Sequence, residues 1–313
     1  MSKIVFIQDG MRDRYGILCL YTYLKKHNHE SEVFISDVED DIVGAVLNSN
    51  PDIIGFSTMT TEFKIHQSIA EQIKKRRKDL PIIVGGSHPT FYPEIINDPN
   101  IDVVCLNEGE YALVELLNTI GEDGDLGQAI NIKNLWVKYN SKVYKNEMGD
   151  LIKDLDEVSP KDRDIYCKRY EELRGRPTKT IYVGRGCPFD CTYCFNHALK
   201  EMIKGKGSMI RLRSINNVFN EIRILKEKYG LQWVHFNDDT FNFRREWLNE
   251  FLERYPNEIG IPFFCNVRAD FLDEELVVKL KNAGIVRVNF GVEHGSYEIR
   301  KKLLKRNITD EQL

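Results

Sequence analysis

The sequence lacks the features of several large protein classes. No apolar run reaches the ~18–20 residues that crossing a bilayer requires, and the N-terminal stretch meets Asp9 too early for a secretory signal peptide. Lys and Arg number 44 against 48 Asp and Glu, and this formal net charge of -4 offers no basic surplus for nucleic acid. We therefore expect a cytoplasmic protein with no membrane span and no nucleic-acid partner.

Nucleotide motifs and a disulfide framework are missing as well. No G-x-G-x-x-G follows the first expected strand, and no G-x-x-x-x-G-K-[ST] is present. Seven cysteines is an odd number, and a chain of 313 residues is too long to need disulfides. Four cysteines stand alone and are expected to pack as small apolar groups: Cys19, Cys105, Cys167 and Cys265.

Apolar strand-like segments alternate with amphipathic helical segments through the first 120 residues. The expected strands are Lys3–Gln8, Glu32–Ser36, Asp52–Ser57, Pro81–Gly86 and Asp102–Leu106. This alternation predicts right-handed βαβ units and a doubly wound parallel sheet, so the fold class is α/β. We expect this first domain to span residues 1–125.

Polar and small residues follow three of the expected strands, where a doubly wound sheet binds its ligands. They are Ser57, Thr58, Gly85, Gly86, Ser87, Glu108, Gly109 and Glu110. Small residues there allow a large ligand to lie against the backbone, but ordinary βα turns favour the same residue types. On the chemistry of these residues alone, a ligand site and ordinary βα turns are about equally supported.

Residues 126–176 are expected to form a hairpin followed by an interdomain linker. The hairpin pairs Leu135–Tyr139 with Lys142–Asn146 through a turn at Asn140 and Ser141. The change in pattern begins at Gly121, and the charged stretch after the hairpin is irregular.

A strand expected at Thr178–Val183 leads into three closely spaced cysteines. Cys187, Cys191 and Cys194 have the spacing C-x3-C-x2-C, which brings three thiolates to one soft metal centre. One interpretation is structural zinc with His197 as fourth ligand; the other is a [4Fe–4S] cluster with one open iron. The chain has no second cysteine pair, and the loop follows a strand that opens a βα series, so the cluster is favoured.

Three more strands are expected in the second half of the chain: Trp233–Asn237, Pro262–Val267 and Arg287–Gly291. Charged residues follow them, at the ends where a (β/α) barrel places its active site. Asp238 and Asp239 follow the first strand, Arg268 the second and Glu293 the third. The two aspartates could form a general-acid/base pair, or be a helix N-cap and its neighbour.

The cysteine spacing, with Tyr193 just before the last cysteine, resembles the motif of the radical S-adenosylmethionine enzymes. The resemblance implies that a [4Fe–4S] cluster binds the amino and carboxylate groups of S-adenosylmethionine. One electron then cleaves this cofactor to a 5′-deoxyadenosyl radical that abstracts hydrogen. It also implies an electron donor such as flavodoxin or ferredoxin, and a small-molecule or peptide substrate. The residues implied to hold S-adenosylmethionine are Tyr193, Asp238, Asp239, Arg268 and Glu293.

Four other segments resemble one subfamily, the radical enzymes with an N-terminal cobalamin-binding domain: Gly16–Leu18, Val84–Thr90, Asn107–Leu117 and Gly291–Leu303. Cobalamin is then implied to lie across the eight strand-end residues of the first domain. The lower cobalt ligand is unassigned, because no D-x-H-x-x-G follows the first strand. Most such enzymes methylate an unactivated carbon. The alternatives are a radical rearrangement or cyclisation with the same cofactors, and a non-catalytic cobalamin or metal sensor.

Residues 177–313 are expected to form a partial (β/α) radical S-adenosylmethionine barrel. They supply about four strands, fewer than the family's barrel contains. The final Thr309–Leu313 segment reads T-x-x-Q before an apolar residue, a capping box that predicts the start of a helix. We therefore expect a C-terminal truncation, with further strands and the substrate-selecting region in the missing part.

Overall fold

The computed structural model describes residues 1–120 and 124–313, so Gly121, where the sequence pattern changes, lies outside the described residues. The described chain divides into two compact units. Unit 1 comprises Met1–Asp150 and Glu157–Arg174, and unit 2 comprises Leu151–Asp156 and Gly175–Leu313. Among the described helices, none has the length and apolar character to cross a membrane.

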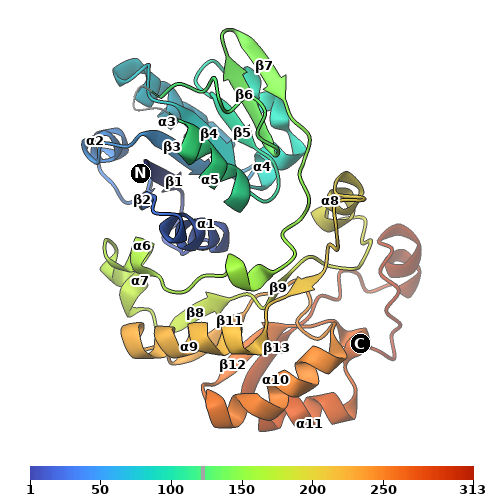
Figure 1. The fold of residues 1–313 in the computed structure, drawn as a ribbon. Helices are drawn as coiled ribbons and strands as arrows, with labels where there is room; N and C mark the ends of the chain where they lie inside the picture. Colours follow the sequence, from blue (N-terminus) through green and yellow to red (C-terminus); the bar gives the residue numbers. More distant parts are fainter. Residues whose placement is uncertain (121–123) are drawn as a thin grey trace. The chain divides into compact units, whose positions relative to one another are not determined.

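In the described residues, unit 1 is built on a seven-stranded sheet of order β2-β1-β3-β4-β5-β6-β7 (Figure 1). Its first five strands are parallel: β1 (Lys3–Gln8), β2 (Glu30–Ile35), β3 (Ile53–Ser57), β4 (Ile82–Gly85) and β5 (Val103–Cys105). The order 2-1-3-4-5 is that of a doubly wound sheet, with the reversal of strand order between β1 and β3. The expected α/β class and the five strands are confirmed.

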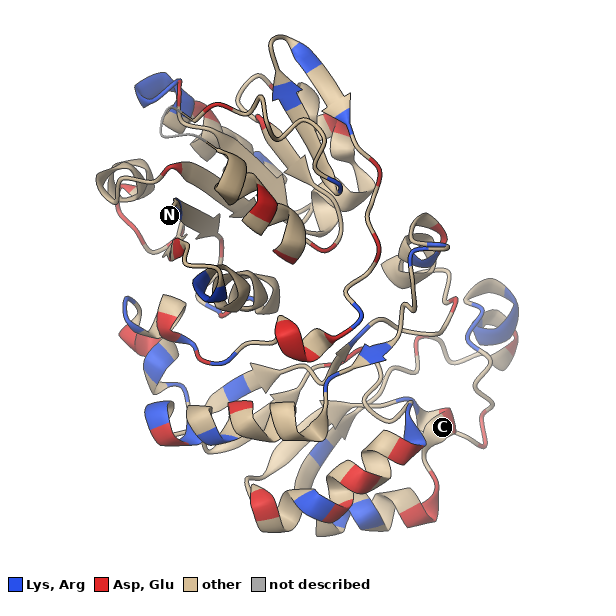
Figure 2. Cartoon of the chain, in the orientation of Figure 1, with Lys and Arg blue, Asp and Glu red and all other residues tan. Residues whose placement is uncertain are grey.

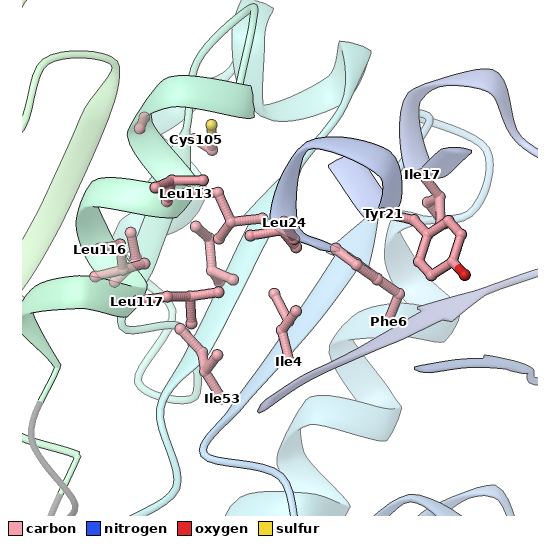
Figure 3. Packing of buried hydrophobic residues seen from close by; sticks show 14 of the residues in the cluster. Ile4, Phe6, Ile17, Tyr21, Leu24, Ile53, Cys105, Leu113, Leu116 and Leu117 are labelled. Atoms are coloured by element: carbon pink, nitrogen blue, oxygen red, sulfur yellow. The ribbon is translucent and has the colours of Figure 1, made fainter. Parts of the chain in front are cut away.

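Successive side chains of a strand point to opposite faces of the sheet, and in these strands both sets are apolar. Helices therefore cover both faces. Ile4 and Phe6 of β1 pack with α1 (Tyr15–Lys26) and α5 (Glu110–Thr119), as Figure 3 shows. Val5 and Ile7 join the opposite core, beneath α2 (Ile42–Asn48) and α3 (Phe63–Arg76). Two short helices follow β4, α4 (Ser87–Phe91) and η1 (Pro93–Asn97).

The expected hairpin is present and continues the first sheet. β6 (Leu135–Tyr139) and β7 (Lys142–Lys145) turn through Asn140 and Ser141, whose φ angles of 48° and 62° suit a type I′ turn. β6 pairs antiparallel with β5, so Val137 lies opposite Val103. The hairpin is therefore part of unit 1.

The segment after the hairpin returns to unit 1 through buried tyrosines. It holds η2 (Leu155–Glu157), α6 (Asp164–Cys167) and α7 (Glu171–Gly175). The hydroxyl of Tyr166 donates to Gln8 Oε1 at 2.5 Å and accepts from the Arg14 N–H at 3.2 Å. Since Tyr166 is fully buried, these bonds join a segment distant in sequence to the end of β1.

Unit 2 contains, within residues 124–313, a four-stranded parallel sheet of order β13-β12-β11-β8. Its strands are β8 (Thr178–Ile181), β11 (Trp233–Phe236), β12 (Phe263–Asn266) and β13 (Ile285–Asn289), and all four were expected. The helices α9 (Ile215–Tyr229), α10 (Arg245–Glu258) and α11 (Glu274–Asn282) connect successive strands and pack on one face. In Figure 2 acidic and basic residues are interspersed along these helices.

An aromatic cluster forms the centre of the unit 2 core. Phe236 of β11 lies edge-on to Phe251 and Tyr255 of α10, and Phe219 of α9 contacts the same two rings. Pairs of this kind contribute about 0.5–1.5 kcal/mol beyond their buried area. The buried residues of α9 recur at helical spacing, and the helices α10 and α11 were not predicted from the sequence.

The remaining elements of unit 2 are short. β9 (Gly184–Arg185) pairs antiparallel with β10 (Arg211–Leu212), and α8 (Phe195–Met202), η3 (Ala269–Phe271) and η4 (Ile299–Leu303) follow strand ends. Near Leu313 the described chain forms a turn. There the Thr309 N–H donates to Gln312 Oε1 at 2.9 Å, which is one of the two bonds of the predicted capping box.

Tyr166→Phe tests the attachment of residues 157–174 to unit 1. Removing the hydroxyl leaves the Gln8 amide oxygen and the Arg14 N–H without a partner, so we expect the free energy of unfolding to fall by about 1–3 kcal/mol. Urea titration measures this change. Tyr92→Phe is the control, because Tyr92 is 59% exposed; equal effects of the two substitutions would contradict the proposed anchoring.

Candidate functional site

The three clustered cysteines lie on the loop that leaves the carboxyl end of β8. This cysteine loop (residues 187–194) begins after β9 and ends where α8 starts. Gly186, just before it, has a φ of 89°, and a Cβ atom there would overlap the Met209 carbonyl oxygen. Only glycine allows this approach to the chain that leads into β10, so the entry to the cysteine loop depends on this residue.

The cysteine thiols supply the soft donors that a cluster needs. Cys191 is buried, Cys187 and Cys194 are half-buried, and all three are free. Burial raises the pKa of the Cys187 thiol, with smaller contributions from Asp239 and Cys194. As the side chains stand, no three His, Cys, Asp or Glu residues in the described ranges are grouped closely enough to hold a metal ion. Three thiols on one short loop nevertheless fit the donor chemistry of an iron–sulfur cluster.

His197, the alternative fourth ligand, is engaged locally. Its Nδ1 atom lies 2.6 Å from the carbonyl oxygen of Cys194. The ring therefore caps its own loop, and within residues 1–120 and 124–313 it joins no group of three metal ligands.

Asp238 holds the junction between β8 and the cysteine loop. Its buried carboxylate accepts hydrogen bonds from the Val183 N–H at 3.0 Å and the Gly184 N–H at 2.8 Å. Burial raises the pKa of this carboxyl to about 7, although the two backbone donors and Arg213 lower it. The structure thus directs Asp238 toward the backbone of its own sheet, and it is not a helix N-cap here.

Asp239 and Arg268 contact residues in or next to the cysteine loop and none of the three cysteines in the described hydrogen bonds. Exposed Asp239 accepts a hydrogen bond at 2.9 Å from Asn196, the second residue of α8. The buried Arg268 guanidinium forms two bonds to Asp270, at 3.0 and 2.8 Å. Its carbon atom also lies 3.5 Å from the ring centre of Phe189 in the cysteine loop. The ends of β11 and β12 therefore support this loop.

Tyr193 and Glu293 occupy the exposed side of the same region. The Tyr193 side chain is 47% exposed, and its hydroxyl accepts a hydrogen bond from Arg306 at 3.2 Å. Burial, and then nearby Cys191 and Glu293, raise the pKa of Tyr193, against the effect of Arg306. Glu293 is exposed and has a φ of 68°. The structure brings both predicted residues near Arg306, a residue that was not predicted.

A ladder of asparagines across three strand ends was also missed. Asn266 donates to Asn237 at 2.9 Å, and Asn289 donates to Asn266 at 3.2 Å. Asn237 in turn donates to the Tyr182 hydroxyl at 2.7 Å. An asparagine closes each of the segments WVHFN, FFCN and IVRVN. That repetition was a readable signal for a polar row at the carboxyl edge of the sheet.

In unit 1 the structure brings the ends of β3 and β4 into close contact. The Thr58 N–H donates to the Gly85 oxygen at 2.8 Å, and the His88 N–H donates to the Thr58 oxygen at 3.1 Å. Gly86 has a φ of 106°, and a Cβ atom there would lie 2.7 Å from the Thr58 oxygen. Ser57 ends β3, and the exposed Ser87 opens α4. Five of the eight predicted residues therefore lie together.

The other three predicted residues follow β5, the neighbour of β4. Glu108 and Gly109 are half-buried, and a Cβ atom on Gly109 would lie 3.1 Å from the Cys105 sulfur. Glu110 opens α5, but its side chain is buried. The Glu110 side chain thus belongs to the interior rather than to the exposed strand ends.

Polar side chains that lie behind these strand ends were not predicted. Arg14 donates to the Ser57 oxygen at 2.9 Å and forms an ion pair with Glu62. His66 of α3 lies with Nδ1 2.8 Å from Thr58 Oγ1 and Nε2 3.4 Å from Asp9 Oδ1. Together they fasten the loop after β1 to the end of β3.

Comparison with known proteins assigns a family to each unit. The model of the B12 binding domain matches residues 13–117, and the model of the radical S-adenosylmethionine superfamily matches residues 181–313. This chain contains a B12 binding domain and a radical S-adenosylmethionine domain. The family is the one that the cysteine spacing and the strand-end segments indicated.

Individual relatives are similar over nearly all of the chain. An uncharacterized methyltransferase of Pyrococcus horikoshii is 27% identical over 294 residues, 92% of this chain and 62% of the relative. The anaerobic magnesium-protoporphyrin IX monomethyl ester cyclase of Rubrivivax gelatinosus is 23% identical over 302 residues, 93% of this chain and 53% of the relative. The chain thus spans between half and two thirds of the length of these relatives.

A solved structure supports the fold. The radical S-adenosylmethionine methyltransferase TsrM of Kitasatospora setae, determined with cobalamin and a [4Fe-4S] cluster bound, has a TM-score of 0.73 and 20% identity. The match covers 96% of this chain and 62% of TsrM. The cofactors of this radical S-adenosylmethionine protein are a [4Fe–4S] cluster, S-adenosylmethionine and cobalamin.

Gly186→Ala tests the entry to the cysteine loop. Strain at positive φ and the overlap with Met209 are expected to displace the loop, so iron per chain after anaerobic reconstitution should fall to roughly half or less. Iron and sulfide assays measure this loss. Gly205→Ala is the control, since Gly205 also has a positive φ, 79°, but no atom within 4 Å of an added Cβ. Equal iron contents in both variants would show the expectation to be wrong.

Asp238→Asn tests the raised pKa. Between its ordinary value of 3.8 and about 7, the folded chain keeps a proton that the unfolded chain releases, so the free energy of unfolding decreases as pH rises. From pH 5 to 7.5 this decrease should be about 2–3 kcal/mol larger in the wild-type chain than in the variant. Urea titrations at both pH values measure it, with exposed Asp190→Asn as control. The same pH dependence in all three chains would contradict the buried, protonated Asp238.

Proposed function

We propose that this chain carries the cofactor machinery of an enzyme that methylates an unactivated carbon of a small molecule or peptide. The proposal includes a cytoplasmic electron donor such as flavodoxin or ferredoxin. Its main support is the three-thiol loop at the carboxyl end of a parallel sheet, in a chain that also has a B12-binding domain. The methyltransferases among its relatives support the same reaction class.

The second unit is proposed to generate the radical. Cys187, Cys191 and Cys194 hold the cluster, at which S-adenosylmethionine binds through its amino and carboxylate groups. When bound, the cluster supplies an electron, S-adenosylmethionine a 5′-deoxyadenosyl radical, and cobalamin a transferable methyl group. Asp238 keeps the cysteine loop attached to its sheet through the two backbone N–H groups. The exposed Asp239 is the better of the two carboxylates for moving a proton.

The remaining cofactor contacts are also proposals. Tyr193, Arg268 and Glu293 are proposed to surround S-adenosylmethionine, with Arg268 acting through the Phe189 ring and Asp270. Cobalamin is proposed to lie on the strand ends of unit 1: Ser57, Thr58, Gly85, Gly86, Ser87, Glu108 and Gly109. Glu110 contributes its backbone at the start of α5, because its side chain is buried.

A second candidate is a radical cyclisation with the same cofactors. The similarity to the Rubrivivax gelatinosus cyclase, which extends over 93% of this chain, supports this candidate. The two reactions differ in their products. Methyl transfer from S-adenosylmethionine releases S-adenosylhomocysteine, whereas cyclisation does not.

Product analysis of the reconstituted chain tests the proposal. With S-adenosylmethionine, cobalamin and reduced flavodoxin under anaerobic conditions, we expect both 5′-deoxyadenosine and S-adenosylhomocysteine, the latter from transfer of the methyl group to reduced cobalamin. Cys191→Ser removes one thiolate and should reduce 5′-deoxyadenosine formation by about 100-fold or more. Cys19→Ala, outside the motif, should retain it. 5′-Deoxyadenosine without S-adenosylhomocysteine would favour cyclisation, and neither product from a cofactor-loaded chain would indicate a sensor.

A further inference from the structure

One buried arginine in unit 2 lacks the anionic partner that its burial requires. Five arginine side chains are buried in the described part of the chain: Arg163, Arg213, Arg268, Arg300 and Arg306. The first four form ion pairs with Asp13, Glu221, Asp270 and Asp310, respectively. For Arg306, no carboxylate of the described residues lies within the 4.0 Å of an ion pair. Burying a guanidinium without a counter-charge is unfavourable.

The contacts of Arg306 are all with uncharged oxygen atoms. Nη1 donates to the Tyr193 hydroxyl at 3.2 Å, and Nη2 donates to the Gly291 carbonyl oxygen at 2.8 Å. Nε is buried and has no hydrogen-bond partner among the described residues. The side chain is only 7% exposed, so water does not solvate its charge fully. Arg306 is therefore a desolvated cation with an N–H group to spare.

Backbone contacts hold this cation beside the cysteine loop. The Thr192 N–H donates to the Leu304 oxygen at 3.1 Å, and Thr192 Oγ1 donates to the Leu303 oxygen at 2.8 Å. The chain just before Arg306 is thus fixed to the cysteine loop independently of the arginine side chain. Tyr193, which Arg306 contacts, is the immediate neighbour of Cys194. The position of the unpaired charge is consequently built into the fold.

We infer that Arg306 binds the carboxylate of S-adenosylmethionine, an assignment that rests on the proposed function. The carboxylate is the single anionic group of that cofactor, and the proposed function places it at the cluster. An arginine fork matches a carboxylate in geometry and charge. Arg268 is less suited, because Asp270 already occupies its fork with two bonds. Glu293 lies near Arg306 without forming an ion pair with it, and a reduced cluster is a further anion, so the test must separate the carboxylate of the ligand from both.

The experiment compares two ligands on the anaerobically reconstituted full chain. Equilibrium dialysis measures the Kd of S-adenosylmethionine and of decarboxylated S-adenosylmethionine, which lacks only the carboxylate. For Arg306→Gln we expect the Kd of S-adenosylmethionine to rise about 10- to 100-fold, with the Kd of the decarboxylated ligand unchanged within about twofold. Arg306→Lys should recover part of the affinity, because lysine keeps the charge without the fork.

Lys305→Gln is the matched control, since it removes an exposed neighbouring charge and should change neither Kd. Iron, sulfide and thermal unfolding are measured for every variant. If Arg306→Gln weakens both ligands equally, leaves both unchanged or loses iron, Arg306 serves the fold or the cluster and the assignment is wrong. If the wild-type chain holds iron and sulfide but binds neither ligand, the proposed function fails, and the assignment fails with it.

Discussion

The structure of unit 2 around the cysteine loop depends on the hydrogen bonds from Val183 and Gly184 to the Asp238 carboxylate. A loop that carries three metal-binding thiols must leave its strand in a defined direction, and the Asp238 carboxylate fixes that direction by accepting from both backbone N–H groups. Asp238 comes from the neighbouring strand β11, so the junction is held across the sheet. A charged acceptor makes such bonds stronger than a neutral one, although burial of the carboxylate opposes its ionisation.

Other contacts extend this support from the sheet to both ends of the cysteine loop. Gly186 permits the close approach to Met209 before the loop, and Asn196 binds Asp239 after it. Thr192 and Tyr193 connect the middle of the loop to the chain around Arg306. The loop is therefore positioned by residues from four separate parts of unit 2. Its donors are brought to the carboxyl edge of the sheet, as in other barrel-type active sites.

In unit 1 the strand ends are positioned by close backbone contacts rather than by a buried carboxylate. Gly86 and Thr58 approach so closely that a side chain at position 86 would clash with the neighbouring strand end. This leaves main-chain atoms and small side chains at the edge of the sheet, the surface that a large planar ligand needs. The side chains of Arg14, Glu62 and His66 lie behind that edge and stiffen it.

Much of the fold was predictable because its signals are local. Strands such as Lys3–Gln8 are short apolar runs, and the cysteine spacing is visible in eight residues. The helices α10 and α11 were not predicted, although α11 begins at an Asp273 N-cap. The role of the hairpin was also not visible, since its pairing with β5 joins residues 30 to 34 positions apart.

The sequence by itself determined the α/β alternation, the thiol donor set and the family, because these reside in periodicity, residue chemistry and short motifs. Only the tertiary structure decided which polar side chains are available. Asp238 and Arg268 both follow expected strands, yet one binds backbone N–H groups and the other Asp270. Arg306 had no distinguishing pattern in the sequence. Its importance arises from burial and from the lack of an ion pair with any carboxylate of the described residues, and both depend on how distant segments pack.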